Sequence, residues 1–169
     1  MTSSPPAPPR RAVVVTPTFD EKDNIADLIE AVLAEQAVVD AFEIHLLVAD
    51  SHSADGTLEI VAALADQNPR VHLLDVQERG IGIGLFRGFQ HAIDALDADV
   101  LIEMDADFQH NPEDIPLFLA KIAEGYDVVV GSRFVEGSVN RMPAHRKLLS
   151  VGANQTVRSA LGLHGVTEI

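Results

Sequence analysis

The sequence predicts an α/β domain in which helices flank a mostly parallel sheet. Short, β-branched apolar runs alternate along the chain with segments whose apolar residues recur every three or four positions. The first pattern is typical of buried strands and the second of amphipathic helices. Polar residues repeatedly follow the apolar runs. Strands that alternate with helices in this way form parallel sheets with helices on both faces.

Each strand is expected where a short apolar run stops at a polar residue. The run at 12–15 consists of alanine and valine and precedes Thr16 and Pro17, and the run at 43–49 stops at Asp50. Runs of this length and composition are typical of buried strands. In chain order, the expected strands are 12–15, 43–49, 71–76, 100–104 and 127–130.

Each helix is expected from the spacing of its apolar residues or from the residues at its ends. Apolar residues within 25–33 recur at i, i+3, i+4, i+7 and i+8, which places them on one helix face. Gly56 and Thr57 turn the chain into the next helix, and Asn111 is expected to cap a helix that has Pro112 in its first turn. In chain order, the expected helices are 25–33, 57–65, 82–96, 112–124 and 148–161.

The composition is that of a folded protein and excludes several function classes. The chain has 169 residues, 47% of them hydrophobic, which suits one domain or most of one. Its 12 basic and 26 acidic residues give a formal net charge of −14. No nucleic-acid partner is expected, because non-specific binding needs a basic surface, and a broad electrostatic grip on anionic lipid is disfavoured too. The absence of cysteine excludes disulfides and thiolate metal sites.

A flexible, proline-rich tail is expected over 1–11, followed by a single domain over 12–169. Residues 2–9 are Thr, Ser, Ala and Pro without an apolar stretch behind a charged start, so they do not predict a signal peptide. No apolar run approaches the roughly 18 to 20 residues that cross a bilayer. The expected location is therefore cytoplasmic, and peripheral contact with a membrane face is compatible with it.

Polar residues gather where strands of the predicted sheet end. In open α/β sheets, ligands bind beyond the carboxyl ends of the strands. An active-site edge is therefore expected there, although loops carry polar residues in any case. The residues in question are Thr16, Asp50, Asp105, Asp107 and Arg133.

Two carboxylates one residue apart, Asp105 and Asp107, follow the apolar run at 100–104. Hard divalent cations prefer oxygen ligands and retain positions for phosphate oxygens. Such an ion would hold a diphosphate and neutralise the charge that develops on a leaving nucleotide. The alternative interpretation is a pair of acidic loop residues, one of which caps the following helix.

The same segment carries a family resemblance. Residues 105–116 read Asp-Ala-Asp-Phe-Gln-His-Asn-Pro-Glu-Asp-Ile-Pro. This stretch resembles the Asp-Ala-Asp-Leu-Ser/Gln-His-x-Pro-Glu-x-Ile-Pro signature of the dolichol- and polyprenol-phosphate mannose synthases, which belong to glycosyltransferase family 2. Other segments resemble motifs of that family in the same order, and together the match covers roughly 13–163. These segments are 17–25, 53–57, 131–135 and 145–154.

The resemblance implies a Rossmann-like glycosyltransferase A fold and the inverting transfer of a sugar, mannose from GDP-mannose, to a polyprenyl or dolichyl phosphate. An acceptor phosphate oxygen would attack the anomeric carbon on the side opposite the nucleotide. That oxygen is already anionic at neutral pH, so no strong general base is required. Mg²⁺ or Mn²⁺ is the implied cofactor, and a partner subunit or a homo-oligomer is left open.

The resemblance also implies roles for individual residues. Asp105, Asp107 and Gln109 would hold the metal. Arg133 and Arg146 would bind the acceptor phosphate, and Asp107 and Arg133 would be the catalytic residues. The residues implied in binding the sugar nucleotide are Pro17, Phe19, Glu21, Asp50, Asp105, Ala106, Asp107 and Arg133.

Several of these residues also have a structural interpretation. Phe19 would then be a core aromatic, Asp50 a turn or cap residue, and Gln109 a surface amide. Arg133 would form a surface salt bridge, and the acceptor role of Arg146 is no better supported than a structural one.

Two further features invite a chemical interpretation that the sequence does not favour. His110 and His145 are expected in structural or acceptor-side positions. The glycine run at 80–84 matches neither a Walker loop nor a dinucleotide fingerprint. It corresponds instead to the family's Gly-Leu-Gly loop, with a purely structural turn as the alternative.

The chain also departs from the family pattern. Ser51 replaces a second acid, Glu78 aligns with a basic residue although Arg79 is adjacent, and Phe19 lacks the usual tyrosine hydroxyl. Residues 165–169 stand where the family has an Asp-x-Thr-Ser-Gly-Phe-Arg element. These departures predict a truncated or diverged member that binds sugar nucleotide and turns over poorly. The alternatives are a family-2 enzyme with another sugar nucleotide, such as a glucose donor, or with a soluble acceptor, and a non-catalytic nucleotide-sugar-binding or partner-binding remnant.

Overall fold

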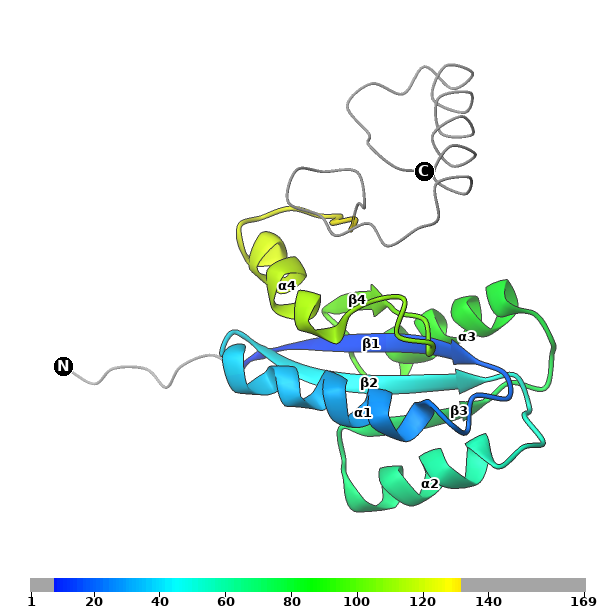
Figure 1. Cartoon of the computed structure of the whole chain (residues 1–169). Coiled ribbons are helices and arrows are strands. Elements are labelled where there is room, and N and C mark those ends of the chain that lie inside the picture. The colour runs from blue at the N-terminus through cyan, green and yellow to red at the C-terminus, as the bar shows by residue number, and fades with distance from the viewer. Residues whose placement is uncertain (1–7, 132–169) are drawn as a thin grey trace, which may run out of the picture. The chain divides into compact units, whose positions relative to one another are not determined.

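The computed structural model describes residues 8–131, and its contacts divide the chain into two units, 1–126 and 127–169. In the first unit, one sheet has the strand order β3-β2-β1-β4, and all neighbouring strands are parallel (Figure 1). The predicted parallel sheet is therefore confirmed. Its strands are β1 (Arg10–Thr18), β2 (Phe42–Asp50), β3 (Val71–Asp75) and β4 (Val100–Glu103).

Helices cover both faces of this sheet, as the sequence predicts. Side chains of β1 alternate between two cores: Ala12 and Val14 belong to the core that includes residues of α1, α2 and α4, whereas Val13 and Val15 pack with α3. Figure 1 shows α1 and α3 on opposite sides of the sheet. The helices are α1 (Ile25–Ala34), α2 (Thr57–Gln67), α3 (Ile81–Asp94) and α4 (Ile115–Ala123), with 3₁₀ turns η1 (Glu35–Val38) and η2 (Pro112–Asp114).

The strand order creates a topological switch point at β1, because β2 lies on one side of it and β4 on the other. Pairing between β1 and β4 ends at Val15 and Glu103, and the Met104 N–H then donates to the Val15 carbonyl. Beyond this point, β2 is the one strand among residues 8–131 that still pairs with β1. Pro17 is tolerated there because its missing N–H faces the side that β4 has left. The two strands therefore part at the edge where α/β sheets bind ligands.

Two sequence predictions need correction. β1 begins at Arg10 and pairs with Phe42 of β2, so Arg10 and Arg11 belong to the sheet and not to the predicted tail. The predicted strand at 127–130 is wrong, because residues 127–131 form no strand. An apolar run supplies strand propensity, but a strand exists only where a neighbouring backbone pairs with it, and no described residue does so here.

Several predictions lie outside the described residues. They concern the tail residues 1–7, His145, the helix at 148–161, the segment 165–169 and the two arginines assigned to the acceptor, Arg133 and Arg146. Within 8–131, no helix has both the length and the apolar character that a membrane span requires.

Candidate functional site

The carboxyl edge of the sheet brings together the described residues that the sequence assigned to a site. Pro17 is buried near the end of β1, and Phe19 and Glu21 follow in the loop before α1. Asp50 is the last residue of β2, and the segment 105–109 follows β4 directly. Residues far apart in the sequence therefore share one edge, next to the switch point.

Asp50 is a buried hydrogen-bond acceptor at this edge. Its side chain is fully buried. One carboxylate oxygen accepts from the Thr18 and Ser53 hydroxyls, each at 2.7 Å, and the other accepts from the Ser53 N–H at 2.7 Å. This arrangement matches the turn-residue interpretation of Asp50. Its contact with a base or ribose stays a prediction.

The loop between β1 and α1 is held by the loop between β2 and α2. The N–H of Glu21 donates to the Thr57 hydroxyl at 3.0 Å, and the N–H of Lys22 donates to Asp55 at 3.1 Å. Burial alone would raise the pKa of Asp55, but hydrogen bonds from Thr57 and Lys22 outweigh it and lower that pKa. The sequence indicated residues 53–57 only as a family motif. It did not predict their contacts with the loop between β1 and α1, which carries Phe19 and is called the Phe19 loop below.

Phe19 is not a core residue, because 46% of its surface is exposed. The Arg79 guanidinium lies over its ring, 5.0 Å from the centroid. Glu78, which stands where the family has a basic residue, instead binds Arg87 at 2.7 Å, and this hydrogen bond lowers the pKa of Glu78. Arg79, one residue after Glu78, therefore supplies the cation at this edge, and its guanidinium lies against the exposed ring of Phe19.

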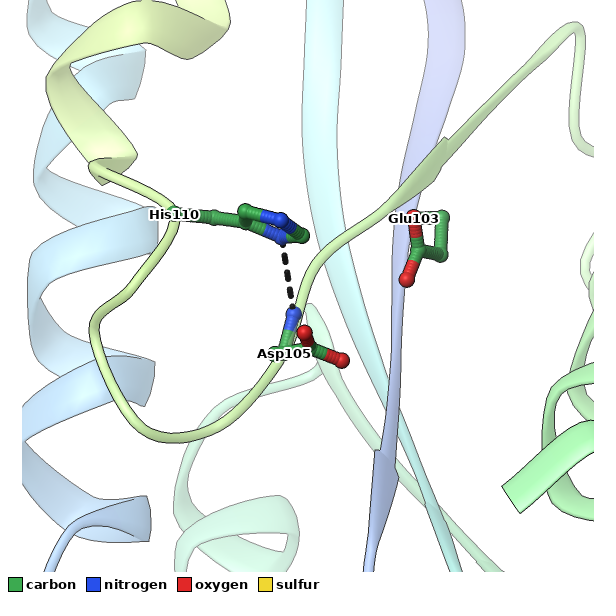
Figure 2. A group of neighbouring side chains, drawn as sticks. All are labelled: Glu103, Asp105 and His110. Carbon is green, nitrogen blue, oxygen red and sulfur yellow. Dashed lines mark hydrogen bonds between the residues drawn. The ribbon is translucent and has the colours of Figure 1, made fainter. Parts of the chain in front are cut away.

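An acidic group lies where β4 ends. Glu103, Asp105 and His110 offer ligand atoms that all lie within 4.8 Å of one another. Figure 2 shows His110 reaching back from the loop, with the Asp105 N–H donating to its Nδ1 at 3.2 Å. Because Nδ1 accepts this bond, the ring proton lies on Nε2. His110 thus has a local structural role, as the sequence favours. With Nδ1 accepting this bond, the two carboxylates of Glu103 and Asp105 are the groups left to hold an ion.

Only Asp105 is shared between this group and the predicted metal ligands. Asp107 accepts hydrogen bonds from both the backbone and the side-chain N–H of Gln109, so these two residues pair with each other. Ala106 is buried in the core beside them. The metal roles of Asp107 and Gln109 stay predictions. Glu103 was not predicted, and its only signal is that a carboxylate closes an apolar run.

The chemistry of this group fits a hard divalent cation. Carboxylate oxygens suit Mg²⁺ and Mn²⁺, which also keep positions for phosphate oxygens. Glu103 and His110 are exposed and Asp105 is half-buried, so the group is accessible to an ion and to a phosphate. The donor set therefore agrees with the implied cofactor, while the ion itself stays a prediction.

The sequence did not predict a second polar cluster, at the ends of β2 and β3. Asp75 pairs in register with Asp50, and its carboxylate lies 2.9 Å from His52 Nδ1 and accepts from the Gln77 amide at 2.9 Å. The glycine run has a packing role at the same edge. A Cβ on Gly84 would lie 3.4 Å from the Ser51 hydroxyl, so glycine lets α3 approach the strand ends closely.

The sequence model of glycosyl transferase family 2 matches residues 13–164. The chain belongs to this family. The family-2 resemblance predicted from the motifs is thus confirmed over nearly the whole chain.

Curated relatives carry names that agree with the motif resemblance. A dolichol-phosphate mannosyltransferase of Pyrococcus furiosus is 34% identical over 88% of this chain and 40% of its own length. A polyprenol monophosphomannose synthase of Mycolicibacterium smegmatis is 34% identical over 95% of this chain and 60% of its own length. The chain therefore spans only part of these relatives.

A solved structure with a similar fold is the mannosyl-3-phosphoglycerate synthase of Rubrobacter xylanophilus. It matches 69% of this chain and 37% of its own chain, with a TM-score of 0.54 and 18% sequence identity. At this identity the likeness concerns the fold alone. With the family match, it confirms the predicted glycosyltransferase A fold.

Proposed function

We propose that this chain carries the donor-binding part of an inverting glycosyltransferase that transfers mannose from GDP-mannose to a polyprenyl or dolichyl phosphate. The observation that carries the proposal is the acidic group of Glu103 and Asp105 at the switch point, on the same sheet edge as the exposed ring of Phe19. An acidic metal group suits a diphosphate, and an aromatic face suits a base. The names of the two relatives support the mannosyl donor and the polyprenyl acceptor.

Different residues would contact different parts of the sugar-nucleotide donor. Phe19 offers its face to the base, with Arg79 adding a positive charge that also favours the phosphates. Pro17, Glu21 and Asp50 line the base and ribose end. The backbone of Ala106 lies beside the ribose, as the family resemblance implies.

Asp105, Asp107 and Gln109 serve the diphosphate end, together with Glu103. A bound Mg²⁺ or Mn²⁺ would neutralise charge on the departing diphosphate. Asp105 and Glu103 would hold that ion at the end of β4. The pairing of Asp107 with Gln109 keeps the Asp107 carboxylate at the same edge, where it would face the donor.

The transfer needs little from the protein beyond positioning and charge. An acceptor phosphate oxygen forms a bond to the anomeric carbon as the bond from that carbon to the diphosphate oxygen breaks. GDP leaves with the electron pair, and the configuration inverts. Arg133 and Arg146 are proposed to grip the acceptor phosphate, since a guanidinium binds phosphate bidentately. A lipid acceptor also implies that the protein works at a membrane face.

A transfer assay tests this proposal. The chain is incubated with GDP-mannose, a short polyprenyl phosphate and Mn²⁺, and the product is identified by mass spectrometry and by the NMR signal of its anomeric proton. We expect mannosyl polyprenyl phosphate with the configuration opposite to that of the donor. Asp107→Asn should abolish the product, whereas Asp114→Asn is the matched control, because Asp114 is exposed and its side chain caps no N–H.

A retained configuration would contradict the inverting mechanism, and a product formed from UDP-glucose alone would contradict the mannose assignment. One observation favours a second candidate, the non-catalytic nucleotide-sugar-binding protein. Ser51, which stands where the family has a second acid, is 5% exposed and its N–H donates to Thr18 within the fold. GDP-mannose binding without any transfer would support that second candidate.

A further inference from the structure

The loop that carries Phe19 has little packing of its own. Phe19 and Asp20 are exposed, and Asp20 adopts a left-handed backbone conformation with φ of 58°. A residue other than glycine is uncommon in this region and persists there only when its surroundings hold it. Something outside the loop must therefore fix its path between β1 and α1.

Three consecutive backbone N–H groups supply that constraint. Asp20 donates to the Ser53 hydroxyl at 2.8 Å, Glu21 to the Thr57 hydroxyl at 3.0 Å, and Lys22 to an Asp55 carboxylate oxygen at 3.1 Å. All three acceptors come from the stretch between β2 and the first residue of α2. Each side chain of this set thus receives one N–H of the loop.

The acceptors are themselves anchored. Ser53 donates its hydroxyl to the buried carboxylate of Asp50, which ties it to the end of β2. The Thr57 hydroxyl donates to Asp55, and the same carboxylate oxygen accepts the Thr57 N–H at the start of α2. Ser53 and Thr57 are buried. The loop is therefore held by a hydrogen-bonded base that is buried at Ser53 and Thr57 and solvent-exposed only at the contact between Lys22 and Asp55.

We infer that Ser53, Asp55 and Thr57 are positioning residues that preorganise the Phe19 loop for the nucleotide. This inference rests on the proposed function, because it assigns the loop to the donor. None of the three side chains needs to touch the ligand. A loop fixed before binding loses less conformational entropy when the ligand arrives, so the three hydrogen bonds contribute to affinity through the loop.

Thr57→Val and Thr57→Ser form the sharpest pair of variants. Valine keeps the shape of Thr57 but removes the acceptor of the Glu21 N–H, whereas serine restores it. The carboxylate of Asp55 accepts hydrogen bonds from the N–H groups of Lys22 and Thr57. In Asp55→Asn an amide NH₂ faces one of these N–H groups and cannot accept its hydrogen bond. Asp66→Asn is its matched control, since Asp66 is exposed and lies on α2, the helix that follows Asp55.

Two quantities are measured on each folded variant, which is first checked by circular dichroism. Hydrogen exchange reports the protection of the Glu21 amide, and calorimetry reports the affinity for GDP with Mn²⁺. In Thr57→Val we expect faster exchange of Glu21 and an affinity about tenfold weaker, the usual effect of one lost hydrogen bond. Thr57→Ser and Asp66→Asn should resemble the wild type in both measurements.

The outcomes separate this inference from the proposed function. Faster exchange of Glu21 with unchanged GDP affinity overturns the positioning role and leaves the donor site standing. Unchanged exchange in Thr57→Val overturns it as well, because the hydroxyl would then not hold the loop. If the wild type binds no nucleotide, the proposed function fails, and this inference fails with it.

Discussion

Gly88 of α3 lies directly against Val15 of β1: a Cβ on Gly88 would stand 2.5 Å from Val15 Cγ1 and 3.1 Å from the Cβ of Ala49. Both neighbours lie in the central strands, so the helix would have to move. We predict that Gly88→Ala lowers the free energy of unfolding by about 1–3 kcal/mol, as overpacking usually does. Chemical denaturation of the wild type and the variant measures this change in the free energy of unfolding.

Gly82→Ala is the matched control for that substitution. No atom lies within 4 Å of a Cβ at Gly82, which belongs to the same helix. This variant should be neutral or more stable by up to about 1 kcal/mol, because alanine favours the helix. Equal stability of the two variants would contradict the close packing of α3 on β1.

We predict that the folded protein loses stability in mild acid because His72 becomes protonated. Burial, with positive charge at His45, Arg11 and His91, lowers the pKa of His72 from 6.5 to about 4. The unfolded chain therefore takes up this proton at a higher pH than the folded protein does. The stabilising contribution is complete above pH 6.5 and is lost as the pH falls from 6.5 to about 4.

Denaturation at several pH values between 4 and 7 tests this prediction in the wild type and in His72→Gln. Glu43 has a lowered pKa, chiefly through its hydrogen bond with His45, and it also contributes at the acid end. The quantity to compare is therefore the difference in the free energy of unfolding between the wild type and His72→Gln at each pH. The variant should show the flatter pH dependence, and parallel curves would refute the assignment to His72.

Arg79 and Arg87 form a natural pair for testing the cation at Phe19. Arg79→Gln removes the guanidinium over the ring, and we predict that GDP binds about five- to tenfold more weakly. Arg87→Gln breaks only an exposed ion pair with Glu78 and should leave GDP affinity unchanged. Calorimetric titration compares them, and an equal loss in both variants would mean that general charge, not the Phe19 contact, matters.

Much of the fold follows from local patterns. The apolar runs predicted β1 to β4 and the apolar spacing predicted α1, because burial on one face leaves a direct trace in the sequence. Turn, glycine and capping residues predicted the starts of α2, α3 and α4. The extent of β1 did not follow, since its pairing with β2 includes Arg10 and Pro17, which no propensity favours. The run at 127–130 failed for the same reason, because pairing depends on neighbours that propensity does not report.

The position of candidate site residues could be predicted where their signal is local. Asp105 and Asp107 follow an apolar run, and the structure places them at the end of β4. The contacts of Ser53 and Thr57 with the Phe19 loop were missed because each joins residues more than thirty positions apart. Glu103 was missed because an acid at a strand end resembles any solvated residue.

The most direct test of the account is a calorimetric titration of GDP-mannose, GDP and UDP-glucose, each with and without Mn²⁺. It compares the wild type with Asp105→Asn and, as a control, Asp114→Asn. The account predicts that GDP-mannose binds in the presence of Mn²⁺, that the binding disappears in Asp105→Asn, and that Asp114→Asn retains it. A folded wild type that binds none of the three nucleotides would contradict a metal-dependent nucleotide-sugar site at the ends of β1 and β4.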